Sequence, residues 1–321
     1  MRALIVGGAG FIGSHFTDRL LADDATEIVT LYDNFTSGRE WHYEAHAADP
    51  RLNVIRGEVA DLESLTRAMD GHRLVVHLAS NPDIAKAMTD PRVDFDEGTA
   101  LTFSVVEAAR RAGVAEILYA SGSGVYGDLG EEEAQEDRGP MLPTSTYGAS
   151  KLAGEAMLSS YVAMFGLRAS AFRFGNVVGP RQTHGVGFDF VRRLRREPTT
   201  LDILGDGRQS KSYIHVYDVV NAVLAMSRSR VDPFEVFNIA TGDYITVTEI
   251  AELALSVVGL SPGTTTFRYS GGDRGWKGDV PIVRLSTERA NSRGWTCERT
   301  CREALMASME SMFLDDERGR L

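Results

Sequence analysis

The first thirty-three residues constrain the fold most, because they combine two apolar runs with a glycine-rich turn and an amphipathic segment. The first apolar run, at residues 4–6, leads into the sequence GGAGFIG at residues 7–13. The second run, at residues 29–32, ends in Asp33, twenty residues after Gly13. This order predicts strand, tight turn, helix and strand, with an acidic side chain at the end of the second strand.

The glycine turn is suited to bind a dinucleotide. One glycine permits the tight turn, a second lets the backbone approach a pyrophosphate, and Gly13 permits close packing of the helix on the strand. Free N–H groups at the helix N-terminus favour negatively charged phosphates. Asp33 would accept hydrogen bonds from an adenosine ribose, and its charge would repel a 2′-phosphate. We therefore expect NAD rather than NADP, bound by Gly7, Gly10, Phe11, Ile12, Gly13 and Asp33.

Further strand ends extend this expected cofactor site. Apolar runs at residues 53–55 and 74–78 predict two more parallel strands, whose carboxyl ends line the same crevice. The residues that follow Asp33 and that end or follow these runs are candidates for cofactor contacts: Asn34, Glu58, Val59, Leu78, Ala79 and Ser80. Either Glu58 or Asp61 is expected near the adenine. His77 lies inside the second run, where a histidine is either a hydrogen-bonded core residue or a catalyst.

Strands and helices are expected to alternate along the first half of the chain. An amphipathic segment at residues 101–111 closes at Gly113, and another apolar run follows at residues 117–120. This alternation predicts an α/β fold, a doubly wound parallel sheet of the Rossmann type with a smaller C-terminal substrate lobe. We expect residues 1–175 to form the NAD-binding domain, to which later segments return, and residues 176–321 to form mainly the substrate-binding domain.

Composition and charge exclude several classes of protein. The net charge of −11 argues against a nucleic-acid partner, because such proteins usually carry a basic surface. No apolar run reaches the roughly 20 residues of a membrane span, so we expect a cytoplasmic protein without a membrane partner. Cys297 and Cys301 lack a companion His or Cys pair, so we expect neither a metal site nor a disulfide. The one local basic cluster is either a solvated helix face or part of a phosphate channel: Arg192, Arg193, Arg195 and Arg196.

Tyr147 and Lys151 are the expected catalytic pair. They lie four residues apart on a predicted helix and therefore share one face. A phenol with the usual pKa near 10 is a poor base at neutral pH, but a neighbouring ammonium and a nicotinamide cation both favour the phenolate. Tyr147 would then remove a proton from a substrate hydroxyl while hydride passes to NAD.

These motifs occur together with Val-Tyr-Gly at residues 125–127 and Arg-Phe-Gly-Asn-Val-Val-Gly-Pro-Arg at residues 173–181. In this combination the chain resembles the extended short-chain dehydrogenase/reductase family, whose members are mostly nucleotide-sugar epimerases and dehydratases. The resemblance implies that Tyr147 is the acid/base, that Lys151 also binds the cofactor ribose, and that NAD is recycled within each turnover. It also implies a homodimer formed through the helices near residues 101–111 and 150–164.

The resemblance extends to the substrate lobe. Asn176 matches the family's substrate-binding asparagine, and residues 205–218 resemble a nucleotide-sugar segment that usually contains an arginine, here Lys211. The loop at residues 271–279 resembles the loop whose arginine clamps the diphosphate, which implies that role for Arg274. An arginine suits a phosphate because its planar fork offers two donors at once. Asn81 is also a candidate for substrate binding.

One position departs from the family pattern. Epimerases of the family usually place Ser or Thr four residues before the tyrosine of Val-Tyr-Gly, and the 4,6-dehydratases place Thr-Asp-Glu from that position onward. Here residues 122–124 are Gly-Ser-Gly. Ser123 is therefore either the replacement hydroxyl, after a small backbone shift that its glycine neighbours permit, or a residue that only bonds the loop backbone.

The whole chain is also similar to family members that act as 5,6-dehydratases on UDP-N-acetylglucosamine in tunicamycin antibiotic biosynthesis. This similarity implies an enzyme that oxidises C4 of a UDP-hexosamine, loses water across C5 and C6, and returns hydride to C4, leaving a 5,6-alkene. Tyr147, freed after the first step, is the hypothetical base for the C5 proton. UDP-sugar 4-epimerisation is the alternative. A non-catalytic NAD-binding sensor is a remote alternative, because a binding module has no need of an activated phenol.

Overall fold

The computed structural model describes residues 1–81 and 84–320, which form two compact units. The first unit contains residues 1–125, 145–173 and 223–237. The second contains residues 126–144, 174–222 and those from 238 onward. The chain therefore crosses between the units several times. The division of roles at residue 175 that the sequence predicts stays a prediction.

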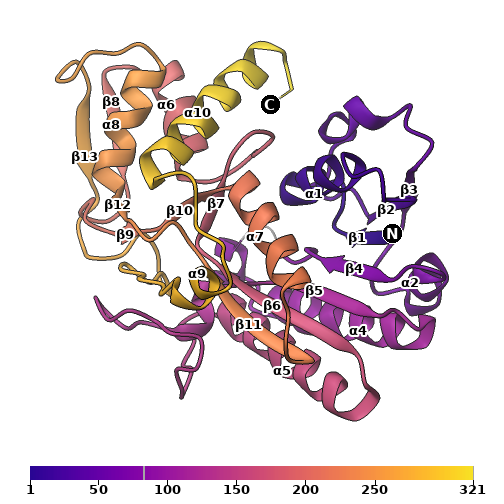
Figure 1. Cartoon of the computed structure of the whole chain (residues 1–321). Coiled ribbons are helices and arrows are strands. Elements are labelled where there is room, and N and C mark those ends of the chain that lie inside the picture. Colours follow the sequence, from indigo (N-terminus) through magenta and orange to yellow (C-terminus); the bar gives the residue numbers. More distant parts are fainter. Residues whose placement is uncertain (82–83, 321) are drawn as a thin grey trace. The chain divides into compact units, whose positions relative to one another are not determined.

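The first unit is built on a seven-stranded sheet with the order β11-β6-β5-β4-β1-β2-β3 (Figure 1). Strand β1 pairs in parallel with β2 and β4, and the pairs β2–β3 and β4–β5 are also parallel. The order reverses beside β1, as in doubly wound sheets, so the predicted α/β fold is confirmed. The strands are β1 (Arg2–Val6), β2 (Ile28–Asp33), β3 (Leu52–Arg56), β4 (Leu74–His77), β5 (Glu116–Gly122), β6 (Arg168–Phe174) and β11 (Phe234–Ile239).

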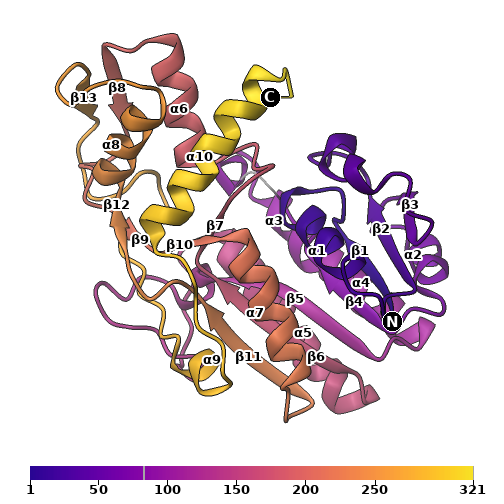
Figure 2. The ribbon, with the colours of Figure 1, turned by 45° about the horizontal axis from the view of Figure 1, so that its top comes forward.

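Helices cover both faces of this sheet, which explains why its central strands are continuous apolar runs. Three helices on one face share a core with the sheet through Leu65, Met69, Val105 and Leu158. Figure 2 shows the first helix on the opposite face. The helices are α1 (Phe11–Leu21) on that opposite face, and α2 (Leu62–Met69), α4 (Leu101–Ala112) and α5 (Thr146–Phe165) on the shared core.

The second unit is built from two-stranded sheets and a helical layer. Strands β7 (Asn176–Val178) and β10 (Tyr213–His215) pair in parallel, as do β8 (Thr200–Ile203) and β13 (Thr266–Tyr269), whereas β9 (Ser210–Lys211) and β12 (Ile245–Thr246) are antiparallel. Helices α6 (Val186–Arg196), α8 (Val247–Val257) and α10 (Cys301–Glu317) pack on one another around a shared apolar core. Capping boxes fix the starts of α8 and α10.

The chain contains several further helices and helical turns. Helix α3 (Arg92–Asp94) continues into a π-helical turn, η4 (Phe95–Ala100), which leads directly into α4. The remaining elements are α7 (Val216–Arg228), α9 (Glu288–Ser292) and the 3-10 turns η1 (Glu40–His42), η2 (Glu44–His46), η3 (Ile84–Met88) and η5 (Ser123–Tyr126).

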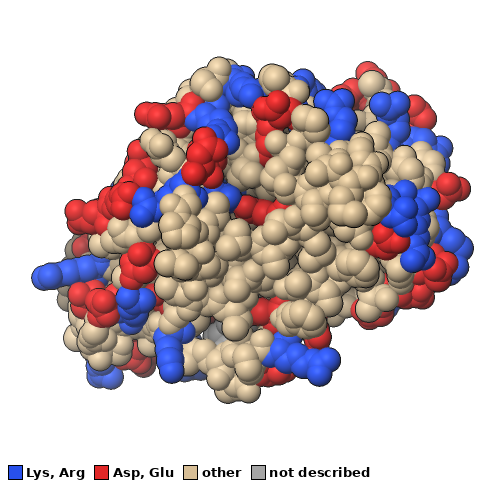
Figure 3. Space-filling view, turned by 90° about the horizontal axis from the view of Figure 1, so that it is seen from below, with Lys and Arg blue, Asp and Glu red and all other residues tan. Residues whose placement is uncertain are grey.

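The surface over α4 and α5 carries exposed apolar side chains. Phe103 is 47% exposed, Met164 is 71% exposed and Phe165 is 48% exposed. The view from below, the side on which α4 and α5 lie in Figure 1, shows a broad area free of charged residues (Figure 3). Within residues 1–81 and 84–320, no helix is long and apolar enough to cross a membrane.

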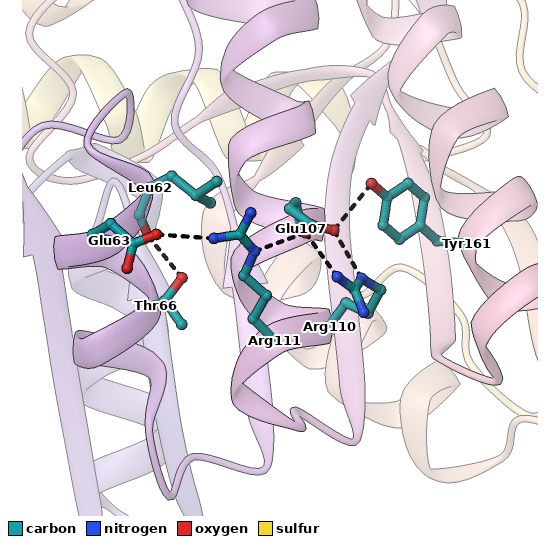
Figure 4. A network of polar contacts seen from close by, with 7 residues as sticks. All are labelled: Leu62, Glu63, Thr66, Glu107, Arg110, Arg111 and Tyr161. Carbon is teal, nitrogen blue, oxygen red and sulfur yellow. Dashed lines mark hydrogen bonds and ion pairs between the residues drawn. The ribbon is translucent and has the colours of Figure 1, made fainter.

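An ionic network joins α2, α4 and α5 beside this surface (Figure 4). The Glu107 carboxylate accepts hydrogen bonds from Arg110 at 2.8 Å, from Arg111 at 2.7 Å and from the Tyr161 hydroxyl at 3.3 Å. Arg111 also donates to Glu63 at 2.9 Å. The hydrogen bond from Arg110 is the main reason that the pKa of Glu107 is lowered to about 2.

We expect Glu107→Gln to destabilise the protein in a pH-dependent way. Because the folded-state pKa is lowered, the stabilisation by the carboxylate is present above the ordinary value of 4.5 and is lost as the pH falls toward about 2. The loss is about 1 kcal/mol at pH 7, since both arginines are partly exposed. Urea unfolding of wild type and variant between pH 7 and pH 2.5 measures it. A difference that does not shrink at low pH would contradict the assignment.

Candidate active site

The glycine turn forms a close cradle at the end of β1. Gly7 adopts φ +82°, and a Cβ there would lie 2.9 Å from the Ala79 nitrogen at the end of β4. A Cβ on Gly13 would lie 2.5 Å from the Gly7 oxygen. Gly10 is the N-cap of α1, and no side chain among the described residues caps that helix. The N–H groups at the start of α1, which include Phe11 and Ile12, are therefore available to phosphate oxygens.

Asp33 ends β2 beside this cradle. Its carboxylate accepts hydrogen bonds from the Ala9 N–H at 2.9 Å and the Phe35 N–H at 2.8 Å. The side chain is buried, and burial raises its pKa. The neighbouring Asn34 donates to Glu58 at 3.1 Å, so the predicted residues from the ends of β2 and β3 lie together.

The end of β4 lies against the end of β1. The N–H groups of Leu78 and Ala79 both donate to the Val6 carbonyl, at 2.9 and 3.0 Å. Val59, which follows β3, is buried in the core that the sheet shares with α2, α4 and α5. The sequence-predicted cofactor residues of the first unit therefore follow adjacent strand ends, as expected for a crevice at the point where the strand order reverses.

Tyr147 and Lys151 lie on the first turns of α5. The Lys151 ammonium is 5.5 Å from the centre of the Tyr147 ring and donates to the Ala120 carbonyl at 2.8 Å. Burial raises the pKa of Tyr147 to about 12; a side-chain hydrogen bond with Ser80 lowers it and the charge of Asp94 raises it further. Burial lowers the pKa of Lys151 to about 8. With this pKa Tyr147 is a phenol at neutral pH, and the phenolate expected from the sequence requires additional positive charge.

A buried ion pair supports α5 behind this pair. Glu155, one turn after Lys151, accepts hydrogen bonds from Arg173 at 3.0 and 2.6 Å and from the Ser121 hydroxyl at 2.5 Å. The Arg173 side chain is 2% exposed and that of Glu155 is 6% exposed. This cluster ties α5 to β5 and β6.

Residues 122–124 lie where β5 ends. A Cβ on Gly122 would meet no atom within 4 Å, so the structure has room for the Ser or Thr of the family pattern. Ser123 begins a 3-10 turn and is partly buried. Its hydroxyl makes no hydrogen bond to the residues that the structure describes. A hydrogen bond from Ser123 to the loop backbone, the second of the two roles that the sequence allows, is therefore not seen among these residues.

Two of the predicted substrate residues of the second unit form ion pairs with carboxylates of the same unit. Lys211 pairs with Asp279 at 2.6 Å. Arg274 pairs with Asp128 at 2.6 Å and donates to the Asp279 carbonyl at 2.9 Å. Asn176 is exposed at the start of β7 and makes a long hydrogen bond of 3.4 Å to the Ser212 carbonyl.

Comparison with known proteins decides the family. The model of the NAD dependent epimerase/dehydratase family matches residues 3–240. The chain belongs to this family. A UDP-glucose 4-epimerase of Corynebacterium glutamicum is 30% identical over 319 residues, which cover 94% of this chain and 92% of that enzyme.

Solved structures of epimerases and dehydratases resemble this family member along its length. A crystal structure of a UDP-galactose 4-epimerase is 35% identical, with a TM-score of 0.86, covering 98% of this chain and 99% of that one. A dTDP-glucose 4,6-dehydratase of Streptomyces venezuelae with NAD bound is 26% identical, with a TM-score of 0.89, covering 99% and 98%.

These likenesses confirm the predicted family, fold and cofactor of this epimerase/dehydratase. Its cofactor is NAD, and the uncapped start of α1, the glycine cradle and the buried Asp33 fit that dinucleotide. The likenesses do not single out a 5,6-dehydratase, because the similar enzymes are named for two different reactions.

Sequence reasoning missed several carboxylates of this family member. Asp94, Asp128, Asp279 and Glu155 all contact predicted site residues or their neighbours. Asp279 has a signal in the sequence, since it ends the glycine-containing loop at residues 271–279 that also contains Arg274, whereas the partner of Asp128 lies 146 positions away. Asp94 and Glu155 carry no such signal, because their partners are distant in sequence.

His77 belongs to the core. It is 1% exposed, and its Nε2 lies 3.0 Å from the Thr102 hydroxyl. Burial lowers its pKa to about 3, so the ring is neutral at physiological pH. Nδ1 has no hydrogen-bond partner among the described residues, so this core histidine is only half satisfied.

Proposed function

We propose that this enzyme is a 5,6-dehydratase of a UDP-hexosamine, with UDP-N-acetylglucosamine as substrate. The observation that carries the proposal of C4 oxidation is the Tyr147–Lys151 pair, buried on α5 next to Ser80 at the end of β4. The choice of dehydration rests on the resemblance of the whole chain to such dehydratases and on the absence of the epimerase Ser or Thr at Gly122.

The first step follows from the chemistry of Tyr147. As phenolate it takes the proton of the C4 hydroxyl; NAD, which the glycine turn and Asp33 would hold, would supply the hydride acceptor for C4. The Lys151 ammonium favours the phenolate and would bind the cofactor ribose. Ser123 would hydrogen-bond the reacting C4 oxygen. Lys211 and Arg274 would bind the diphosphate, and Asn81 and Asn176 the rest of the substrate.

Dehydration then needs one base and one acid. The C4 ketone acidifies the C5 proton. In our proposal Tyr147 gives its proton to the C6 hydroxyl, which leaves as water, and takes the C5 proton as the C5–H electrons form the 5,6 double bond. Hydride returns to C4, and Tyr147 returns its proton to the C4 oxygen. The product is the substrate less one water, with the C4 hydrogen retained.

The alternative is a UDP-sugar 4-epimerase. Several of the similar enzymes carry that name. It shares the first step but requires the 4-keto sugar to turn over before hydride returns. A non-catalytic NAD-binding sensor is less well supported, because Tyr147 and Lys151 are both present and paired.

Product analysis separates these three. Purified protein is incubated with UDP-N-acetylglucosamine in deuterated water, and the product is examined by mass spectrometry and proton NMR. Loss of one water with alkene signals supports the dehydratase. An unchanged sugar mass with inverted C4 supports the epimerase. Binding of NAD without conversion of any UDP-sugar supports the sensor.

We also propose a homodimer through α4 and α5, supported by the exposed Phe103, Met164 and Phe165. Sedimentation equilibrium of wild type and of Met164→Glu tests it. A monomeric wild type would contradict it.

We expect Ser123→Ala to lower kcat by about 10- to 100-fold, the effect of losing one hydrogen bond to a charged reacting oxygen. Adding Gly122→Ser to that variant should restore part of the activity, because a side chain at 122 has open space. Steady-state kinetics measures both. If Ser123→Ala keeps the wild-type kcat, Ser123 is only a loop residue.

We expect Asp128→Asn to strengthen UDP binding about two- to fivefold, because the exposed carboxylate competes with the diphosphate for Arg274. Isothermal titration calorimetry measures the Kd. Asp137→Asn makes the same change in another arginine–aspartate pair, that of Arg289, which is not expected to bind the diphosphate, and serves as the control. Equal or weaker UDP binding by Asp128→Asn would argue that Arg274 does not bind the diphosphate.

A further inference from the structure

Asp94 is a buried carboxylate that the proposed mechanism does not use. It ends α3, where the chain enters the π-helical turn η4, and it is 1% exposed. One carboxylate oxygen accepts a hydrogen bond from the Asn81 amide at 2.9 Å. The other accepts one from the Thr146 hydroxyl at 2.6 Å. Both of these partners are neutral donors.

Its two partners adjoin the proposed catalytic residues. Asn81 follows Ser80, whose side chain hydrogen-bonds Tyr147. Thr146 is the first residue of α5 and directly precedes Tyr147. Asp94 therefore connects the end of β4 to the start of α5.

The turn that follows Asp94 is fitted closely to α5. A Cβ on Gly98 of η4 would lie 2.5 Å from the Ser150 hydroxyl oxygen. Ser150 lies on the same first turns of α5 as Tyr147, and its hydroxyl donates to the Tyr147 carbonyl at 2.8 Å. This close packing holds Asp94 at a fixed position beside the start of α5.

We infer that Asp94 is a positioning residue that orients Tyr147 toward Ser80 and places a negative charge beside its phenol. This inference rests on the proposed role of Tyr147 as the acid/base. It goes beyond the proposed function because it assigns a task to a carboxylate outside the glycine turn, the Tyr147–Lys151 pair and the Gly122–Gly124 segment.

The charge of Asp94 acts against that of Lys151. Asp94 raises the pKa of Tyr147, whereas an ammonium favours the phenolate. Tyr119 of β5 also lies within electrostatic reach of Tyr147. Glu97 of η4 is partly buried. The remaining charged side chains on elements packed against α5 are exposed or paired elsewhere: Lys86, the Arg92–Asp96 pair, the Glu116–Arg230 pair and the Glu107 network. Asp94 therefore disfavours the phenolate of Tyr147, so that the phenolate would form only when the oxidised cofactor adds its positive charge.

Three variants separate the charge from the hydrogen bonds. Asp94→Asn removes the charge but keeps an acceptor for Thr146 and, after a flip of the Asn81 amide, a bond to Asn81. Thr146→Val removes one hydrogen bond and keeps the charge. Thr146→Ser keeps the hydroxyl. Each is prepared as the NAD-loaded protein, and circular dichroism checks that it is folded.

Two readouts are used. Tyrosine labelled with ¹³C at Cζ reports the pKa of Tyr147 by NMR without any turnover, with Tyr147→Phe identifying its signal. The pH dependence of kcat with UDP-N-acetylglucosamine reports the same group during catalysis.

We expect Asp94→Asn to move the Tyr147 titration and the acid limb of the pH profile to lower pH by about one unit. Thr146→Val should lower kcat about tenfold without that shift, and Thr146→Ser should recover the activity. An unshifted titration in Asp94→Asn, or wild-type kcat in Thr146→Val, overturns the inference. If the wild type converts no UDP-sugar but the Tyr147 titration in Asp94→Asn is shifted from that of the wild type, the proposed function fails. The inference that Asp94 acts on Tyr147 then still stands.

Discussion

Tyr147→Phe is expected to lower kcat for conversion of UDP-N-acetylglucosamine by about a thousandfold. The variant keeps the ring in place and removes only the hydroxyl that accepts and returns the C4 proton, and acid/base catalysis typically contributes 10² to 10⁴ in rate. UDP and NAD should still bind with nearly the wild-type Kd, because the expected phosphate contacts lie elsewhere. Single-turnover kinetics with NADH absorbance measures the loss of the oxidation step.

The same variant tests the second role of Tyr147. A supplied 4-keto sugar should exchange its C5 hydrogen with deuterated solvent on the wild type but not on Tyr147→Phe. Continued exchange on the variant would assign the C5 base to another residue. Lys151→Met is the companion variant, since it removes the ammonium while leaving the phenol.

Glu155→Ala is expected to destabilise the protein by about 3–5 kcal/mol. It removes the carboxylate that pairs with the buried Arg173 guanidinium, and breaking a buried pair by removing one member typically costs that much. The Ser121 hydroxyl loses its acceptor in the same variant. Chemical denaturation monitored by circular dichroism gives the difference in the free energy of unfolding.

The double variant Glu155→Leu with Arg173→Met is the control. Replacing both charges by apolar side chains of similar volume is often close to neutral, so most of the lost stability should return. A double variant as unstable as Glu155→Ala would show that packing around α5, rather than the loss of the Glu155–Arg173 ion pair, explains the loss of stability.

Local signals in the sequence were sufficient to predict the fold and the cofactor. The glycine turn, the apolar strands and Asp33 are contiguous segments whose structure depends on nearby residues, and the sheet order and the family match confirm the fold and the cofactor that these segments predict. Tyr147 and Lys151 could be paired because helical spacing alone places them on one face.

Contacts between distant segments could not be read from the sequence. The bonds of Asp94 to Asn81 and Thr146 depend on how α3 packs, and the partnership of Arg274 with Asp128 joins residues 146 positions apart. Burial of Tyr147, which raises its pKa, could not be read from residue spacing either. Helical spacing gave no measure of that burial.

The most direct test of the account is to follow the C4 hydrogen. UDP-N-acetylglucosamine carrying deuterium at C4 is converted in ordinary water, and the product is examined by mass spectrometry and NMR. We predict a product lighter by one water that has a 5,6 double bond and still carries the deuterium at C4. A product that has lost water but also the C4 deuterium would contradict return of hydride to C4. Deuterium retained in a sugar of unchanged mass with inverted C4 would replace the dehydratase with an epimerase.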